Sequence, residues 1–353
     1  VTITSIKCPR RVHPTRALLS WADNETPPVQ TVTSSFCPPP LLRNRHAQTL
    51  LASTLPRKWP LQRRARPLQR DAEDVILQCS DGIRLHGLYN RHPRGERGLA
   101  ILLHGWEGCA ESAYQLSTAL SLHNAGFDVF RLHLRDHGPS HQLNPELFNS
   151  ARLQEVIDAV AAIQQRYPHD RTYMAGHSLG GNFAMRVAAR APAAGIELTK
   201  VVAVCPVLDP MRTMRALEDG SPVYHQYFLR KWKRSLQIKL EHYPELGYGD
   251  SLMAMNSLEQ MNEFFVPNYT PFEDTTAYYR AYSLTGDTLA GLEVPCHIIL
   301  SQDDPMIPAD DLDNVARSDA LTIETPEYGG HCGFLMDWRL NGWIDQRLLE
   351  LFT

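Results

Sequence analysis

A Gly-His-Ser-Leu-Gly segment at residues 176–180 constrains the fold of this 353-residue chain more than any other feature. It has the form G-x-S-x-G, and it lies between an apolar run, 172–175, and a stretch of helical periodicity, 182–191. Small residues on either side of a serine permit the sharp strand-to-helix turn that lifts the hydroxyl out of the fold. The segment therefore predicts that Ser178 is a nucleophile at the end of a strand.

From residue 74 onward, short apolar and β-branched runs alternate with helical stretches, which is typical of a mostly parallel sheet with helices on both faces. With 43% hydrophobic residues the chain can bury a sizeable α/β core. We predict strands at 75–79, 83–89, 99–103, 127–132, 172–175, 201–205, 297–300 and 321–325, and helices at 151–166, 182–191 and 338–349.

One stretch interrupts this alternation. Residues 209–284 show little strand signal and are enriched in aromatic residues and methionine. We interpret them as an inserted helical cap, or lid, which divides the core into 74–208 and 285–353. Most of the apolar side chains in the insertion are expected to form its own small core, and the remainder could line an apolar substrate pocket.

The N-terminal residues, 1–73, are rich in proline and arginine and lack sustained periodicity, so we expect an extended arm. The basic stretch 57–70, which includes Trp59, could attract anionic lipid or nucleic acid, but a solvated arm is the favoured interpretation. A net charge of -4 gives no reason to expect either as the main partner. We therefore predict no nucleic-acid partner.

No run of 18 apolar residues occurs, and no apolar stretch follows Lys7, Arg10, Arg11 and Arg16. We therefore expect no membrane span, no stable membrane insertion and no signal peptide.

The seven cysteines are odd in number and scattered along the chain, and they contain no CxxC pair. This pattern is typical of a protein of the reducing cytoplasm. The cysteines are Cys8, Cys37, Cys79, Cys109, Cys205, Cys296 and Cys332.

A serine hydroxyl needs an imidazole as base and an acid to orient that imidazole. For a G-x-S-x-G serine the chain order is nucleophile, acid, histidine. Asp303 and Asp304 follow the predicted strand 297–300, and His331 follows the predicted strand 321–325. Either aspartate could be the acid at this point, and His331 is the predicted base.

The oxyanion that forms at the attacked carbonyl needs two N–H donors. We predict the backbone N–H of Leu179, directly after the nucleophile, and that of Trp106, in the loop after the predicted strand 99–103. His104 in the same loop is interpreted as a buried structural histidine.

Two further groups invite a metal or redox interpretation. His133, His137 and His141 recur every four residues, but Gly138 and Pro139 break any helix there, so we predict a loop without a metal. Cys332 could be redox-sensitive because it follows His331, although a small buried hydrophobe is the favoured interpretation.

Together these residues resemble the α/β-hydrolase superfamily and, within it, the YheT-like branch of predicted serine esterases. The resemblance covers most of the chain and rests on 45–50 (RHAQTL), 104–108, 176–180, 303–305 and 330–334 (GHCGF). Residues 305–308 also resemble the D-x-apolar-apolar-P pattern after the acid of many such hydrolases, which favours Asp304 over Asp303. The segment 134–138 and the cap at 209–284 depart from the branch's pattern.

The resemblance implies a serine hydrolase that cleaves carboxylic esters through an acyl-enzyme, without a metal or organic cofactor. The aromatic-rich cap favours small or medium apolar acyl esters, and activity is expected to fall below roughly pH 6.5, where a free imidazole is protonated. One alternative is an acyltransferase with the same catalytic residues, and another is a binding protein. A dehalogenase or epoxide hydrolase would carry Asp at position 178. The physiological substrate and the oligomeric state stay open.

Overall fold

The computed structural model describes residues 30–353. The predictions that concern residues 1–29, namely the first part of the arm, the absence of a signal peptide and the role of Cys8, lie outside this range. Five of the cysteines that the structure describes are free thiols, namely Cys79, Cys109, Cys205, Cys296 and Cys332. Within the described residues, no helix combines the length and the apolar character needed to cross a membrane.

The described chain builds one nine-stranded sheet in the order β1-β9-β8-β7-β6-β4-β5-β3-β2. The strands from β4 to β9 and β1 pair in parallel, whereas β2 and β3 form an antiparallel pair at one edge. Their bounds are β1 Gln30–Val32, β2 Glu73–Gln78, β3 Arg84–Asn90, β4 Leu99–Leu103, β5 Asp128–Leu132, β6 Thr172–His177, β7 Lys200–Val204, β8 Cys296–Ile299 and β9 Leu321–Glu324.

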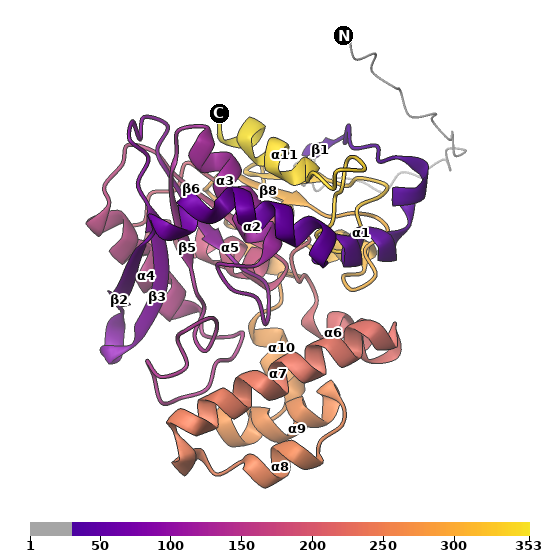
Figure 1. Ribbon diagram of the computed structural model, residues 1–353. Coiled ribbons are helices and arrows are strands. Elements are labelled where there is room, and N and C mark those ends of the chain that lie inside the picture. Colours follow the sequence, from indigo (N-terminus) through magenta and orange to yellow (C-terminus); the bar gives the residue numbers. More distant parts are fainter. Residues whose placement is uncertain (1–29) are drawn as a thin grey trace, which may run out of the picture.

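Helices cover this sheet because each buries one apolar stripe against it. In α4, for example, Val156, Val160 and Ile163 are buried at helical spacing. The helices α2, α3 and α11 pack together in one layer, and α4 packs against α5 (Figure 1). The helices outside the insertion are α1 Arg45–Leu51, α2 Leu55–Arg70, α3 Ala113–Asn124, α4 Leu153–Arg166, α5 Leu179–Arg190 and α11 Trp343–Phe352.

Between β7 and β8 the chain leaves the sheet and forms a helical lobe, which lies below the core in Figure 1. Its helices are α6 Pro210–Asp219, α7 Pro222–His242, α8 Gly249–Ala254, α9 Leu258–Tyr269 and α10 Thr275–Ala281. Asp209 begins the lobe as the N-cap of α6, where its side chain accepts hydrogen bonds from the N–H groups of Met211 and Arg212. The lobe carries no strand among the described residues.

A buried ion pair attaches this lobe to the core. Lys239 of α7 is 1% exposed and its Nζ lies 2.7 Å from Oδ1 of Asp136. The same ammonium donates to the carbonyl oxygens of His141 and Asn144 in the loop after β5. A buried cation with this many partners fixes the position of α7 over the core.

The prediction of an extended arm is wrong for part of its length, because residues 55–70 form the helix α2 despite Pro60 and Pro67. Leu61, Ala65 and Leu68 lie at helical spacing and are buried. Leu61 and Ala65 pack against α3, and the free energy gained by this burial offsets the loss of the hydrogen bonds that the prolines remove.

Short 3-10 segments complete the described secondary structure. They are Pro40–Arg43, Ser80–Gly82, Pro192–Ala194, Pro244–Leu246, Asp287–Leu289 and Ala309–Asn314.

Candidate active site

Ser178 occupies the turn between β6 and α5 with φ 54° and ψ -120°, a backbone conformation that is strained for a residue with a Cβ. Neighbouring glycines make the turn possible. A Cβ on Gly176 would lie 2.1 Å from the carbonyl oxygen of Gly180, and one on Gly180 would lie 2.4 Å from that of His104. The G-x-S-x-G spacing is therefore a steric requirement of this turn.

A continuous chain of hydrogen bonds joins the serine to a histidine and an aspartate. The Oγ of Ser178 lies 2.9 Å from Nε2 of His331, and Nδ1 of His331 lies 2.9 Å from Oδ2 of Asp304. The other carboxylate oxygen of Asp304 accepts from the backbone N–H of Met306 at 2.8 Å and of Ile307 at 3.0 Å. The arrangement can move a proton from the hydroxyl to the imidazole and hold the ring in the tautomer that this requires.

The carboxylate also sets the electrostatics of the histidine. Burial lowers the pKa of the His331 imidazole, but the charge of Asp304, the neighbouring Cys332 and the hydrogen bond to Asp304 raise this pKa by more, to about 9. An imidazolium beside Asp304 is therefore strongly stabilised relative to one in water.

The structure gives the two adjacent aspartates different contacts. Asp304 touches the imidazole, whereas Oδ1 of Asp303 accepts from the backbone N–H of Gly330 at 2.8 Å. Asp303 therefore holds the loop that carries His331, and it does not contact the ring's nitrogens.

An N-terminal helix holds the same loop from the other side, which sequence analysis missed. The Oγ1 of Thr49 in α1 accepts from the backbone N–H of His331 at 2.9 Å. Gln48 is fully buried, and its side chain donates to the carbonyl oxygen of Leu335 and accepts from the N–H of Leu335. Residues 45–50 were singled out for their resemblance, and that was the only signal of this role.

The loop after β4 passes directly beside the serine. A Cβ on Gly105 would lie 3.2 Å from the Cβ of Ser178. Neither the N–H of Trp106 nor that of Leu179 has a hydrogen-bond partner among the described residues, so both can donate to a substrate oxygen.

His104, in the same loop, is fully buried. Its Nδ1 lies 2.8 Å from the carbonyl oxygen of Gly105, and its Nε2 accepts from the backbone N–H of Leu134. Burial lowers its pKa to about 3, as expected for a neutral structural histidine.

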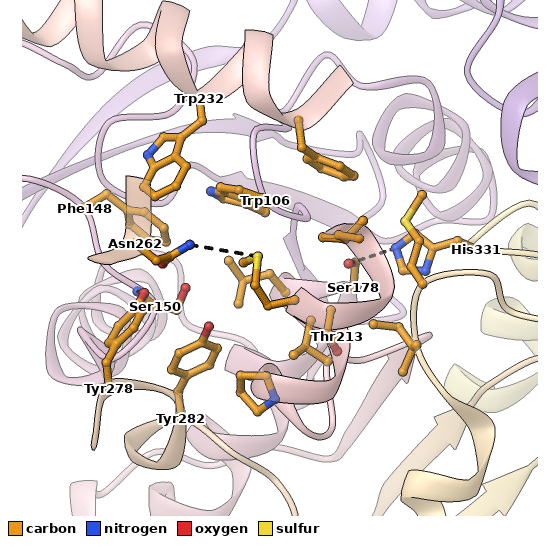
Figure 2. A pocket seen from close by; sticks show the side chains of 18 residues that line it. Trp106, Phe148, Ser150, Ser178, Thr213, Trp232, Asn262, Tyr278, Tyr282 and His331 are labelled. Carbon is orange, nitrogen blue, oxygen red and sulfur yellow. Dashed lines mark hydrogen bonds between the residues drawn. The ribbon is translucent and has the colours of Figure 1, made fainter. Parts of the chain in front are cut away.

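A cavity opens in front of Ser178 and His331, between the core and the helical lobe (Figure 2). Its walls are mainly apolar and aromatic. The indole of Trp106 stacks on Phe228 of α7 at 5.2 Å between ring centroids and meets Trp232 edge-on at 5.3 Å. The other lining residues are Phe148, Ser150, Leu179, Val207, Pro210, Thr213, Met214, Leu217, Asn262, Tyr278, Tyr282, Met306 and Ile307.

The three spaced histidines lie in a loop and bind protein groups. His133 lies 2.8 Å from His86, Nδ1 to Nδ1, and its Nε2 accepts from the N–H of Ala110. His137 Nε2 accepts from the N–H of Glu107, and His141 Nε2 lies 2.9 Å from Ser235 Oγ. These contacts occupy the nitrogens that a metal would need.

Within residues 30–353 one group has metal-ligand geometry, with ligand atoms of Cys205, His331 and Cys332 within 4.8 Å of one another. Both ring nitrogens of His331 are already hydrogen-bonded, to Ser178 and to Asp304. A metal there would have to displace the hydrogen bonds that join the serine to the aspartate.

Comparison with known proteins places this geometry in context. A family model described as the alpha/beta hydrolase fold matches residues 100–335. The Escherichia coli (strain K12) protein named "Putative esterase YheT" is 23% identical over 333 residues, which cover 91% of this chain and 94% of that protein.

Solved structures share the fold. The Pyrococcus furiosus esterase Pf2001 superposes with a TM-score of 0.54 at 14% identity, covering 81% of this chain and 93% of that one. A 2,6-dihydroxy-pseudo-oxynicotine hydrolase superposes with a TM-score of 0.55 at 17% identity, covering 88% of this chain and 75% of that one.

Proposed function

The chain belongs to the alpha/beta hydrolase fold family, and from this premise we propose that it is a serine esterase that cleaves carboxylic esters through an acyl-enzyme on Ser178. The observation that carries the proposal is the unbroken series of contacts from Ser178 through His331 to Asp304 at the wall of an apolar cavity. The similarity to a protein named as an esterase adds support.

In the first half of the reaction, Oγ of Ser178 attacks the ester carbonyl carbon while its proton passes to Nε2 of His331. The oxyanion that forms accepts hydrogen bonds from the N–H groups of Trp106 and Leu179. Asp304 stabilises the imidazolium, which then protonates the departing alcohol as the C–O bond breaks. The acyl group is left on Ser178.

In the second half, His331 takes a proton from a water molecule as the water oxygen attacks the acyl carbonyl. The same two N–H groups stabilise the second oxyanion. The tetrahedral intermediate collapses, Ser178 recovers its proton from His331, and the carboxylic acid leaves.

The helices of residues 209–284 act in this proposal as a cap over the substrate. Residues of α6, α7, α9 and α10 line the cavity opposite Ser178, among them Leu217, Phe228 and Asn262. Apolar walls of this kind favour esters with small or medium apolar acyl groups.

Hydrolysis of p-nitrophenyl esters from acetate to palmitate by the wild type and by Ser178→Ala tests the proposal. We expect turnover that peaks at one chain length and is lost in the variant. An acyltransferase would instead transfer the acyl group to an added alcohol or thiol, which product analysis would detect. Turnover that persists in a purified, folded Ser178→Ala protein would exclude the proposed nucleophile.

A further inference from the structure

Polar groups gather at one end of the otherwise apolar cavity. Figure 2 shows Asn262, Ser150, Tyr278 and Tyr282 on the side of the cavity opposite Ser178. A pocket that served only to hold an alkyl chain would gain nothing from an amide and three hydroxyl groups at this end.

The amide of Asn262 has a donor hydrogen with only a weak partner. Asn262 is 5% exposed, and Nδ2 donates one hydrogen to the carbonyl oxygen of Leu258 at 2.8 Å. Its other contact within the described residues is the thioether sulfur of Met214, 3.9 Å away and drawn as a dashed line across the cavity in Figure 2. A thioether is a weak acceptor, so a buried N–H is left with a poor partner.

A buried cation lies behind the same end of the cavity. Arg186 of α5 is 4% exposed, and no carboxylate of residues 30–353 pairs with it. Its Nη2 donates to the carbonyl oxygen of Ser150 at 2.7 Å, and its guanidinium carbon lies 5.8 Å from the ring centroid of Tyr282. Because its Nε also donates to Oδ1 of Asn182, the guanidinium is occupied by protein groups and fixes the position of Ser150 at this end of the cavity.

The adjoining hydroxyl groups add to this polarity. The backbone N–H of Ser150 donates to the Tyr278 hydroxyl at 2.8 Å, and the rings of Tyr278 and Tyr282 lie 5.0 Å apart between centroids. Tyr278 and Tyr282 are held in place by Arg186 and the end of α10, so these groups are arranged before substrate binds.

We propose that the ester substrate carries a second oxygen acceptor, such as an ether or carbonyl oxygen, remote from the scissile bond, and that Asn262 selects it by donating the N–H that otherwise contacts the sulfur of Met214. This inference rests on the proposed esterase function and names the substrate class of the same site. An alkyl chain would leave the Asn262 N–H with only the weak thioether acceptor of Met214, whereas a correctly placed oxygen would give it a strong one.

A scan of isosteric substrates tests the proposal. In one series, an ether oxygen replaces each methylene from C3 to C7 of the acyl chain of p-nitrophenyl octanoate in turn, and in a second it replaces each methylene from C3 to C7 of the alcohol part of octyl acetate. The first places the oxygen on the acyl side and the second on the alcohol side. The measured quantity is kcat/KM of each oxa-ester divided by that of its alkyl parent.

At one position of the ether oxygen in one series, this kcat/KM ratio is expected to be about 3- to 10-fold higher for the wild type than for Asn262→Leu. A difference of this size corresponds to the free energy of one hydrogen bond. Asn268→Leu is the matched control, because Asn268 lies on the same helix with the same bond to a backbone carbonyl, at Phe264, but is exposed and outside the cavity. Asn262→Asp, which replaces the donor amide with an isosteric group that lacks the N–H, should also lower the ratio and serves if Asn262→Leu does not fold.

The proposal is overturned if the alkyl esters are hydrolysed but no oxa-ester shows a ratio that depends on Asn262, because burying an ether oxygen without a donor only slows the reaction. Loss of the ratio in Asn268→Leu would equally contradict it. If neither alkyl nor oxa-esters are hydrolysed, the proposed function fails and this inference fails with it.

Discussion

At the scale of single residues, two adjacent carboxylates have separate tasks. Asp304 receives the imidazole N–H of His331, and Asp303 receives the backbone N–H of Gly330 one residue before it. Sequence reasoning could limit the acid to this pair, because both follow the same strand. It could not decide between them from spacing alone, since the choice depends on which way each side chain turns after β8.

Asp304→Asn is expected to lower kcat by about 10,000-fold, because an amide stabilises neither the imidazolium nor the required tautomer. Asp303→Asn should cost far less, since an amide oxygen can still accept from the N–H of Gly330. Steady-state kinetics on one p-nitrophenyl ester would compare the two isosteric variants. Equal losses, or a larger loss for Asp303→Asn, would show that the roles are assigned wrongly.

The pH dependence of kcat/KM reports the charge of His331 directly. The base acts in its neutral form, so activity is lost as pH falls through its pKa, which the environment raises to about 9. The acid limb should therefore lie well above the roughly pH 6.5 expected from a free imidazole. Ser178→Ala supplies the blank for spontaneous hydrolysis. A rate that is flat between about pH 5 and 10 would argue against His331 as the base.

At the scale of elements, α1 links the N-terminal segment to the loop that carries His331. A Cβ on Gly330 would lie 2.3 Å from the carbonyl oxygen of Arg45, so this loop and α1 are in direct backbone contact. His46 Nδ1 also lies 2.8 Å from the Tyr224 hydroxyl of α7. Sequence patterns could not reveal these contacts, because they join residues far apart in the chain.

Thr49→Val removes the oxygen that accepts the backbone N–H of His331 while keeping the shape of the side chain. We expect about a 10-fold loss in kcat with little change in KM, because the imidazole is no longer held in place although the cavity is unaltered. Thr49→Ser retains the hydroxyl and should restore the rate. Similar kcat values for Thr49→Val and the wild type would exclude this positioning role.

Local patterns predicted the central strands well because they are continuous apolar runs. Helix α2 was missed because Pro60 and Pro67 argue against a helix when only neighbours in sequence are considered. Its stability comes from packing against α3, which is a tertiary contact. Strand β1 was missed for the opposite reason, because three exposed residues carry no periodicity and pair only with β9.

At the scale of the whole molecule, the core supplies Ser178, Asp304 and His331, while the helices between β7 and β8 supply much of the cavity wall. The chain order of the three residues was predictable, because each follows a strand at the same edge of a parallel sheet. The composition of 209–284 predicted helices and an apolar pocket, but not the polar end at Asn262. That end depends on how α9 and α10 meet α5 in space.

The central claim is that an acyl group passes through Ser178. Rapid acid quenching of the enzyme during turnover of p-nitrophenyl acetate, followed by mass spectrometry of its peptides, tests this most directly. The account predicts one acetyl group, on Ser178, in an amount that matches the initial burst of p-nitrophenol. A burst with the acetyl group on another residue, such as the neighbouring Cys332, or turnover without any acylated peptide, would contradict it.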